Sequence, residues 1–149
     1  MANVIPHSFK SELLSGTHNF ATGGDSFKLA LYTAGSGSPY AATDTAYSSS
    51  VSNEVSTGSP NVGYTTGGLQ LQSQAVATGT GTATVDFANL NFPSSTFSAA
   101  YGVIYNDDKS DKLCVVLDFG GTKTATNGDF TIVFPDPSTP SNAIISLTS

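Results

Sequence analysis

Histidine, cysteine and clustered carboxylates are the side chains that most often carry catalysis or bind metals, and this chain has few of them. It contains two histidines, His7 and His18, and one cysteine, Cys114. A metal site needs three or four converging histidine, cysteine or carboxylate ligands, and the sequence supplies no second cluster of them. We therefore expect both histidines to be surface or packing residues, and Cys114, inside the apolar run KLCVVLDF, to be a buried structural thiol.

The sharpest charged cluster is NDDKSDK, residues 106–112. Its carboxylates, Asp107, Asp108 and Asp111, could offer oxygen ligands to calcium, which prefers such hard donors. Their spacing fits no calcium-binding loop pattern, and the cluster lies between two segments with strand character. We therefore predict a solvated turn between two strands at this position.

The stretch DFGGTKTATNGDFTIVFP, residues 118–135, contains the Asp-Phe-Gly tripeptide of protein kinases. A kinase also needs a glycine-rich loop, a strand lysine and a His-Arg-Asp catalytic loop, and this chain has no arginine. We treat the match as chance and predict a hairpin in which Phe119 ends one strand and the apolar residues from Phe130 onward run back. The positions that tolerate the positive φ of a tight turn are Gly120, Gly121, Asn127 and Gly128.

Other catalytic motifs are missing from the sequence. Neither GSGSP nor TGSPNVG matches the G-x-S-x-G pattern of an activated serine, and no Walker loop or dinucleotide fingerprint is present. Composition alone does not exclude a Ser-His-Asp triad, because triads assemble in space. With no segment that marks a nucleophile, we predict that the protein is not an enzyme and uses no cofactor and no metal.

The composition is poor in charge. Only 11% of the 149 residues are charged, and the net charge is −6, whereas an ordinary soluble domain has about 25% charged residues. A nucleic-acid surface needs clustered lysine and arginine, so nucleic acid is not an expected partner. No apolar run has the length of a membrane span, and the first ten residues lack the pattern of a secretory signal. A surface of hydroxyls with little charge is poorly defended against association, so we infer that neighbours partly cover it; a stable extracellular-type β-module is the alternative.

The periodicity of the chain predicts an all-β fold. A short helix is expected over residues 7–15, within an N-terminal arm of residues 1–22, with Gly16 at its end. We therefore predict one domain over residues 1–149, an antiparallel β-sandwich or barrel-like sandwich of about seven to eight strands. The expected strands cover residues 26–33, 69–78, 83–92, 96–106, 112–120, the return strand that ends near 135, and 142–149.

One region departs from the strand pattern. Residues 35–63 form a long polar segment with few apolar side chains. Loops longer than about 12–15 residues are uncommon in compact domains and are often functional or disordered. Two interpretations stay open: the loop lies along the surface of a neighbouring molecule, or a few tyrosines and valines pin it to its own sandwich.

Three segments together resemble small virion structural proteins of tailed bacteriophages. IPHSFKSELLSGTHNF with GDSFKLALYT (residues 5–20 and 24–33) resembles their opening, and NEVSTGSPNVGYTTGGLQL (53–71) resembles their middle motif. VLDFGGTKTATNGDFTIVFP (116–135) resembles their closing segment. The resemblance does not extend to the serine-rich insert around residues 48–60 or to the connector PDPSTPSN. It implies a component of the phage particle, and it supplies no catalytic residues.

The function that the resemblance and the composition favour is capsid decoration. Such a cement protein would bind over capsomer junctions and stabilise the head. The expected partners are major capsid protein subunits or other virion proteins, with self-association also open and with no nucleic acid and no membrane. Made in the host cytoplasm, the protein would reside on the capsid surface. The residues expected to contact the partner are Phe9, Leu13, Tyr40 and Tyr47.

Two other functions stay open at this point. The same sandwich could belong to the tail, the neck or the base of a fibre, which the number of copies in each particle would distinguish. It could also be a module that binds carbohydrate or a host surface. In that case aromatic rings would stack on sugars, and the candidates are Tyr32, Tyr40, Tyr47 and Tyr64.

Overall fold

The computed structural model describes residues 3–35, 37–139 and 141–149. It consists mainly of strands, which form two antiparallel sheets, with one α-helix among these residues. The predicted all-β sandwich with a short N-terminal helix is therefore confirmed. The elements are β1 (Asn3–Val4), α1 (His7–Leu14), β2 (Phe27–Tyr32), β3 (Leu69–Gln70), β4 (Ala75–Gly79), β5 (Thr82–Asp86), β6 (Leu90–Asn106), the 3-10 turn η1 (Asp107–Lys109), β7 (Lys112–Ile132) and β8 (Ile145–Thr148).

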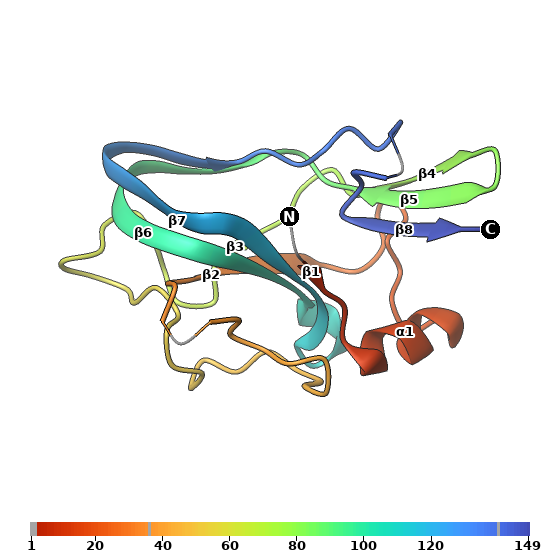
Figure 1. Cartoon of the computed structure of the whole chain (residues 1–149), viewed down its shortest axis with the longest axis horizontal. Coiled ribbons are helices and arrows are strands. Elements are labelled where there is room, and N and C mark those ends of the chain that lie inside the picture. Colours follow the sequence, from red (N-terminus) through yellow and green to blue (C-terminus); the bar gives the residue numbers. More distant parts are fainter. Residues whose placement is uncertain (1–2, 36, 140) are drawn as a thin grey trace.

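The larger sheet has five strands in the order β1-β7-β6-β2-β3, and the smaller has three in the order β4-β5-β8. The long strands β6 and β7 pair along almost their entire length. This two-stranded ribbon bends back over the five-stranded sheet, so the start of β6 and the end of β7 form the opposite layer (Figure 1). The three-stranded sheet lies at the other end of the molecule, above α1.

Strand β2 shows why the larger sheet is apolar on both faces. Phe27, Leu29 and Leu31 point into the main core, between the sheet and the bent ribbon. Ala30 and Tyr32 point into a second apolar cluster on the opposite face. This is the alternation that the sequence predicts for residues 26–33. All these side chains are fully buried, and burying one of the larger ones contributes about 1.5–3 kcal/mol.

The main core is rich in phenylalanine. The Phe20 and Phe27 rings stack with centroids 4.3 Å apart and planes 8° apart. Across the bend of the ribbon, the centroids of the Phe119 and Phe130 rings lie 6.5 Å apart, so the two layers meet through aromatic side chains. Such pairs contribute about 0.5–1.5 kcal/mol beyond the area that they bury.

The predicted hairpin over residues 118–135 is wrong, because β7 continues through it as one strand. The positive φ angles of Gly120 (69°), Gly121 (122°) and Asn127 (51°) serve bulges instead of a turn. Around the two glycines, β7 carries four residues, 119–122, opposite Ala100 alone. Bulges of this kind bend a strand, and here they let the ribbon fold over its own sheet. Residues with positive φ suit both a tight turn and a bulge, so the local sequence does not distinguish the two.

Other predicted strands differ from the observed ones in their limits. The segment 69–78 splits into β3 and β4, and the segment 83–92 splits into β5 and the start of β6. The segments 83–92 and 96–106 also join, because β6 runs through Pro93 with a bulge at Ser94 (φ 51°). Residues 112–120 lie within β7, and residues 113–117 among them are covered on both faces, as predicted, with Cys114 fully buried.

The N-terminal arm folds onto its own domain. Strand β1 pairs with β7 at Val116 and Leu117, and α1 buries Phe9 in the main core. The helix ends as predicted at Gly16 (φ 73°), with backbone bonds from Gly16 to Leu13 and from Thr17 to Glu12 that form a Schellman motif. The arm is therefore part of the sandwich and does not extend away from it.

The long polar segment 35–63 also lies on its own domain. Its described residues cover the second face of the five-stranded sheet, where Tyr40 is buried and Tyr47 and Val51 pack against the same cluster. Isolated β-bridges join Ala46 to Lys112 and Glu54 to Tyr32. Of the two interpretations left open by the sequence, the pinned loop is the observed one. No helix among the described residues is long and apolar enough to cross a membrane.

Candidate functional site

Glu54 is the centre of a clasp that holds the long segment to the sheet. Its Oε1 accepts hydrogen bonds from the Tyr64 hydroxyl (2.8 Å) and the Gly67 backbone N–H (2.6 Å). Its Oε2 accepts one from the Tyr47 hydroxyl (3.0 Å). The Tyr64 oxygen in turn accepts the backbone N–H of Leu31 on β2 (3.0 Å). Both carboxylate oxygens are therefore committed to the fold and are not available to a ligand.

The clasp also explains the glycines of this segment. A Cβ on Gly68 would collide with the backbone carbonyl of Leu29, so only glycine lets the chain approach β2 this closely. Gly63 likewise faces Ser95 at a distance that leaves no room for a side chain. In the segment 53–71, Glu54, Gly63, Tyr64, Gly67 and Gly68 thus hold the chain against the five-stranded sheet.

The tyrosines proposed for sugar stacking are not available for it. Tyr32, Tyr40 and Tyr64 are buried, and the ring of Tyr47 stacks on Tyr105 at 4.3 Å. The Tyr32 and Tyr40 hydroxyls lie 3.3 Å apart in a hydrogen bond. Burial raises the pKa of the Tyr32, Tyr47, Tyr64 and Tyr105 hydroxyls well above the ordinary value, so they stay protonated as donors.

The residues predicted to contact a partner have different positions in the fold. Phe9 is 2% exposed and Tyr40 is 4% exposed, so neither presents a surface for docking; both fill the protein's own clusters because the arm and the loop fold back. Tyr47 is half-buried and is committed to Glu54. Leu13 is half-buried and lines a cavity of about 260 Å³ between α1 and the three-stranded sheet.

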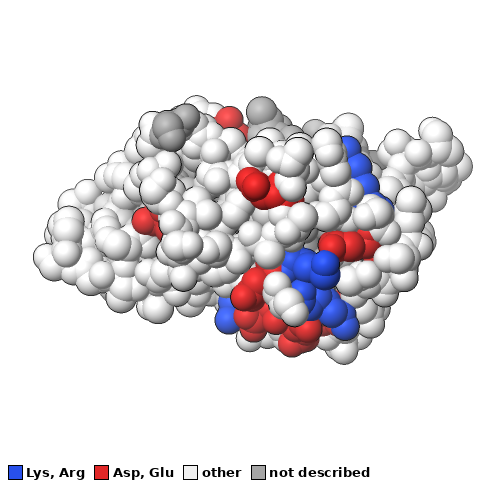
Figure 2. All heavy atoms as spheres, turned by 90° about the horizontal axis from the view of Figure 1, so that it is seen from below, with Lys and Arg blue, Asp and Glu red and all other residues white. Residues whose placement is uncertain are grey.

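On the face that Figure 2 shows, blue and red side chains gather in one patch at the lower edge of the molecule. The 106–112 segment is the turn between β6 and β7, as predicted, and its charges pair with residues far away in sequence. Lys28 pairs with Asp107 at 2.9 Å and Lys109 with Asp25 at 3.4 Å. Burial alone would raise the pKa of Asp25, but hydrogen bonds from Asn106 and from the Asn19 backbone lower it below the ordinary value.

Neither this network nor Cys114 amounts to a reactive site. Within residues 3–35, 37–139 and 141–149 no three metal-ligating side chains converge. His18 contacts Glu12 (3.0 Å) and Asn106 (2.9 Å), and neither partner is a hydroxyl or a thiol that an imidazole base could activate. Burial raises the pKa of the Cys114 thiol far above its usual range, which keeps the thiol protonated and unreactive.

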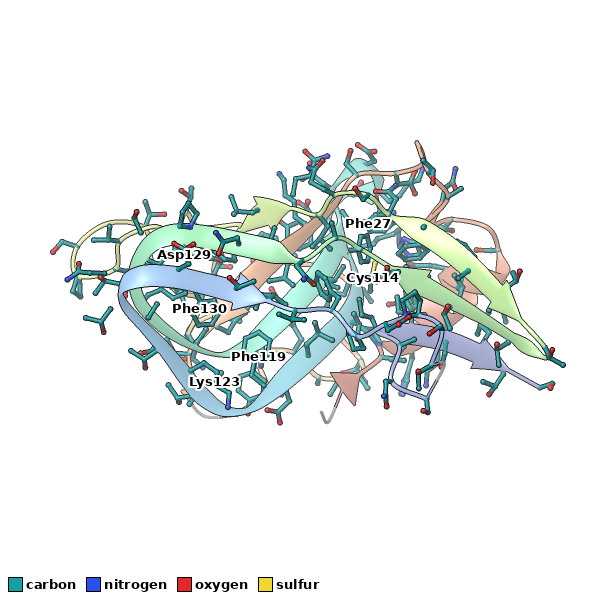
Figure 3. All side chains as sticks on the ribbon, turned by 90° about the horizontal axis from the view of Figure 1, so that it is seen from above. Phe27, Cys114, Phe119, Lys123, Asp129 and Phe130 are labelled. Atoms are coloured by element: carbon teal, nitrogen blue, oxygen red, sulfur yellow. The ribbon has the colours of Figure 1, made fainter. Side chains whose placement is uncertain are left out.

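A hollow lies where the β6–β7 ribbon bends. This cavity of about 650 Å³, which we call the β7 groove, opens between the two halves of β7 and the connector that precedes β8. Phe119 and Phe130 lie inside the curve of the ribbon (Figure 3). Gly102 leaves room for the Phe119 ring, because a Cβ there would lie only 3.0 Å from that ring. The apolar floor consists of Leu117, Phe119, Phe130, Ile132, Phe134 and Ile144.

The rim of the β7 groove is polar, and most of it is already bonded within the protein. Asp129 accepts hydrogen bonds from the Asn91 amide (3.1 Å) and the Ser94 backbone (3.2 Å). The Thr124 hydroxyl bonds to that of Ser98 at 2.7 Å. Lys123 differs, because it is exposed and forms no ion pair with any residue that the structure describes. The rim therefore offers one free positive charge above an apolar floor.

Most residues of this groove lie in the segment 118–135, for which the sequence predicts a hairpin and no site. Phe119, Lys123 and Asp129 all lie in the segment that was expected to turn back. The sequence did contain one signal. Gly120, Gly121, Asn127 and Gly128 are more residues tolerant of positive φ than one tight turn needs, and such an excess favours bulges. No protein-family model, curated protein or solved structure matches the chain.

Proposed function

We propose that this protein is a structural component of the virion of a tailed phage, and that it decorates the capsid by docking through the β7 groove. Two lines support the proposal. The resemblance of three segments to small virion proteins indicates the type of particle. The charge-poor surface and the absence of a reactive constellation among the described residues favour a binding role over catalysis.

The observation that carries the docking role is the coincidence of the groove with an open strand edge. Between Lys123 and Ile132, the edge of β7 that faces away from β6 has no described strand beside it. An open edge offers backbone donors and acceptors to an extended segment of another chain, and an adjacent apolar groove accepts its side chains. The occupant that suits both features is an extended segment of a capsid subunit.

The rim indicates the chemistry of that segment. Because Asp129 and Thr124 already form hydrogen bonds within the protein, they offer few free donors or acceptors to the hydroxyls of a sugar. Lys123 remains as a cation that forms no ion pair with any described residue. A segment with apolar side chains and one carboxylate near Lys123 fits the groove, whereas a saccharide would leave its hydroxyls poorly satisfied.

Retention on the particle then follows from repetition. One strand-sized contact is weak, but a shell presents the same site many times, and copies that touch each other or several subunits dissociate slowly. A low density of charge also reduces the desolvation penalty of broad polar contacts.

The test is binding of the purified chain to phage heads assembled without it, measured by co-sedimentation. We expect the wild-type chain to bind. Lys123→Glu should weaken binding about tenfold, because it opposes the expected carboxylate. Lys10→Glu is the matched control, since Lys10 is also exposed and forms no ion pair with a described residue. If the wild-type chain does not co-sediment with the heads, the proposed function is contradicted. If the two variants bind equally well, docking through the β7 groove is contradicted.

A further inference from the structure

The three-stranded sheet lacks the devices that keep strand edges apart. Monomeric proteins guard such edges with charges, prolines or bulges. Strands β4, β5 and β8 pair in an unbroken register, contain no proline, and carry a single charge, Asp86 on the central strand. Among the described residues, β4 and β8 each have a neighbour on one side only. This sheet is therefore competent to extend across a molecular boundary.

The hydrogen bonds fix which backbone groups of β8 face outward. The Ser149 N–H donates to the Gly81 carbonyl at 3.0 Å, in the same register as the pairs of β8 with β5. Because bonding residues alternate along an antiparallel strand, Leu147 bonds to β5 like Ser149. Ser146 and Thr148 therefore direct their N–H and C=O groups to the open edge.

The side chain at the middle of this edge is apolar. Leu147 is 55% exposed and lies above the cavity beside α1, together with Leu13. Burying this large aliphatic side chain against another surface would be favourable, and the open edge has no charged side chain to oppose it. Because the chain has a net charge of −6, a second copy meets least repulsion where charged side chains are absent, and β8 carries none.

We propose that two copies of this chain associate through β8, antiparallel and about a two-fold axis at Leu147. In this register Ser146 pairs with Thr148 of the second copy and Thr148 with its Ser146, so the outward groups of both residues are satisfied. Leu147 then meets its own counterpart in a non-hydrogen-bonded pair, where side chains lie closest. The two sheets become one, with a continuous apolar underside.

The edge of β4 suits this role less well. The equivalent two-fold axis there would pass through Ala77, which offers little apolar area. Gln74, the residue before β4, already donates hydrogen bonds to the carbonyls of Ala21 and Asp25. Pairing β4 of one copy with β8 of another would be a heterologous contact that can propagate without closing. Pairing through β8 closes as a dimer. The proposal concerns the chain alone and does not depend on its place in a virion.

Disulfide trapping tests the register. Directly opposed residues of a non-hydrogen-bonded pair lie about 4.5 Å apart at Cα, within the range of about 4.4–6.8 Å that a disulfide spans. Leu147→Cys should therefore give a covalent dimer under mild oxidation, while Thr148→Cys, which faces Ser146 of the other copy, should give much less. The native Cys114 is buried and does not interfere. Equal trapping of both variants, or none, overturns the proposal.

Sedimentation of the purified chain provides the second measurement. We expect a concentration-dependent monomer–dimer equilibrium, weak because the contact is small. Leu147→Lys should abolish it, whereas Val62→Lys, at a side chain of matching exposure (53%) elsewhere, should not. Ser146→Pro should weaken it by removing one outward donor from each copy, with the bonds to β5 retained. A chain that stays monomeric at every concentration, or dimers that Leu147→Lys leaves intact, overturns the proposal.

Discussion

The two sheets of this molecule contrast in how they are covered. The five-stranded sheet has the bent β6–β7 ribbon over one face and residues 35–63 over the other, and both contacts are apolar. The three-stranded sheet has α1 beneath part of one face, and its edge strands leave Val76 50% exposed and Leu147 55% exposed. Strands thus form a sealed core in one region and an open surface in the other.

The difference indicates that coverage, more than strand propensity, separates the region that stabilises the fold from the surfaces that we propose to bind partners. Segments from elsewhere in the chain cover the large sheet, and clasps such as that of Glu54 hold them there. No described segment does the same for the edges of the small sheet or for the β7 groove. Substitutions should therefore reduce stability in the first region and association in the second.

The largest effect is expected from Phe27→Ala. Phe27 is fully buried and stacks on Phe20, so truncation should lower the free energy of unfolding by about 3–5 kcal/mol. Val76→Ala in the small sheet should change it by less than about 1 kcal/mol, because half of that side chain is already in water. Urea unfolding of the two variants measures this difference. Similar losses of unfolding free energy in both would contradict the contrast between the two sheets.

Gly68→Ala should come next. The added Cβ collides with the Leu29 carbonyl at a residue with φ 76°, so steric overlap adds to the penalty of the left-handed backbone, for a total of about 3 kcal/mol. Gly23 has the same φ of 76° and nothing within 4 Å of its would-be Cβ. Gly23→Ala should therefore show the backbone penalty alone, about 1 kcal/mol. Equal losses in thermal unfolding would show that close approach to β2 is unimportant.

Glu54→Ala should have a smaller effect on global stability but a clear local one. It removes the acceptor of Tyr47, Tyr64 and the Gly67 N–H, which should lower the unfolding free energy by about 2 kcal/mol. Amide exchange should accelerate in residues 35–63 and leave the three-stranded sheet unchanged. If amide-exchange protection in residues 35–63 does not change, Glu54 does not hold this segment to the sheet.

The smallest effect is the pH dependence contributed by Glu12. Burial would raise the pKa of Glu12, but hydrogen bonds from Lys112 and His18 lower it below the ordinary 4.5. A lowered folded pKa stabilises the protein fully above pH 4.5, and this contribution is lost as the pH falls through the folded value. Glu12→Gln should lower stability by about 1 kcal/mol at neutral pH, and the gap to the wild type should close in acid. A stability difference between wild type and Glu12→Gln that does not change with pH would contradict the lowered pKa of Glu12.

The sequence predicted those elements whose signal is local. Alternation in residues 26–33 and the apolar run at 112–120 correspond to buried parts of β2 and β7, and Gly16 ends the helix as expected. The hairpin at 118–135 was wrong because Gly120 and Asn127 suit a bulge as well as a turn. Only pairing with β6, a distant segment, selects the bulge.

The candidate site was less predictable than the fold. Phe9 and Tyr40 were expected at a partner surface because they lie in an arm and in a loop, and such segments are usually exposed. Both are buried because the arm and the loop fold back onto the domain. The β7 groove arises where Phe119 and Ile144 meet across the bend of the ribbon, and no local pattern brings those residues together.

Testing whether phage virions contain this chain, and in how many copies, examines the proposed function most directly. Quantitative mass spectrometry against the major capsid protein should give a copy number that matches the number of capsomer junctions, with loss of the chain when capsid shells are removed. A low count that purifies with tails would contradict capsid decoration, and absence from the particle would contradict the structural role altogether.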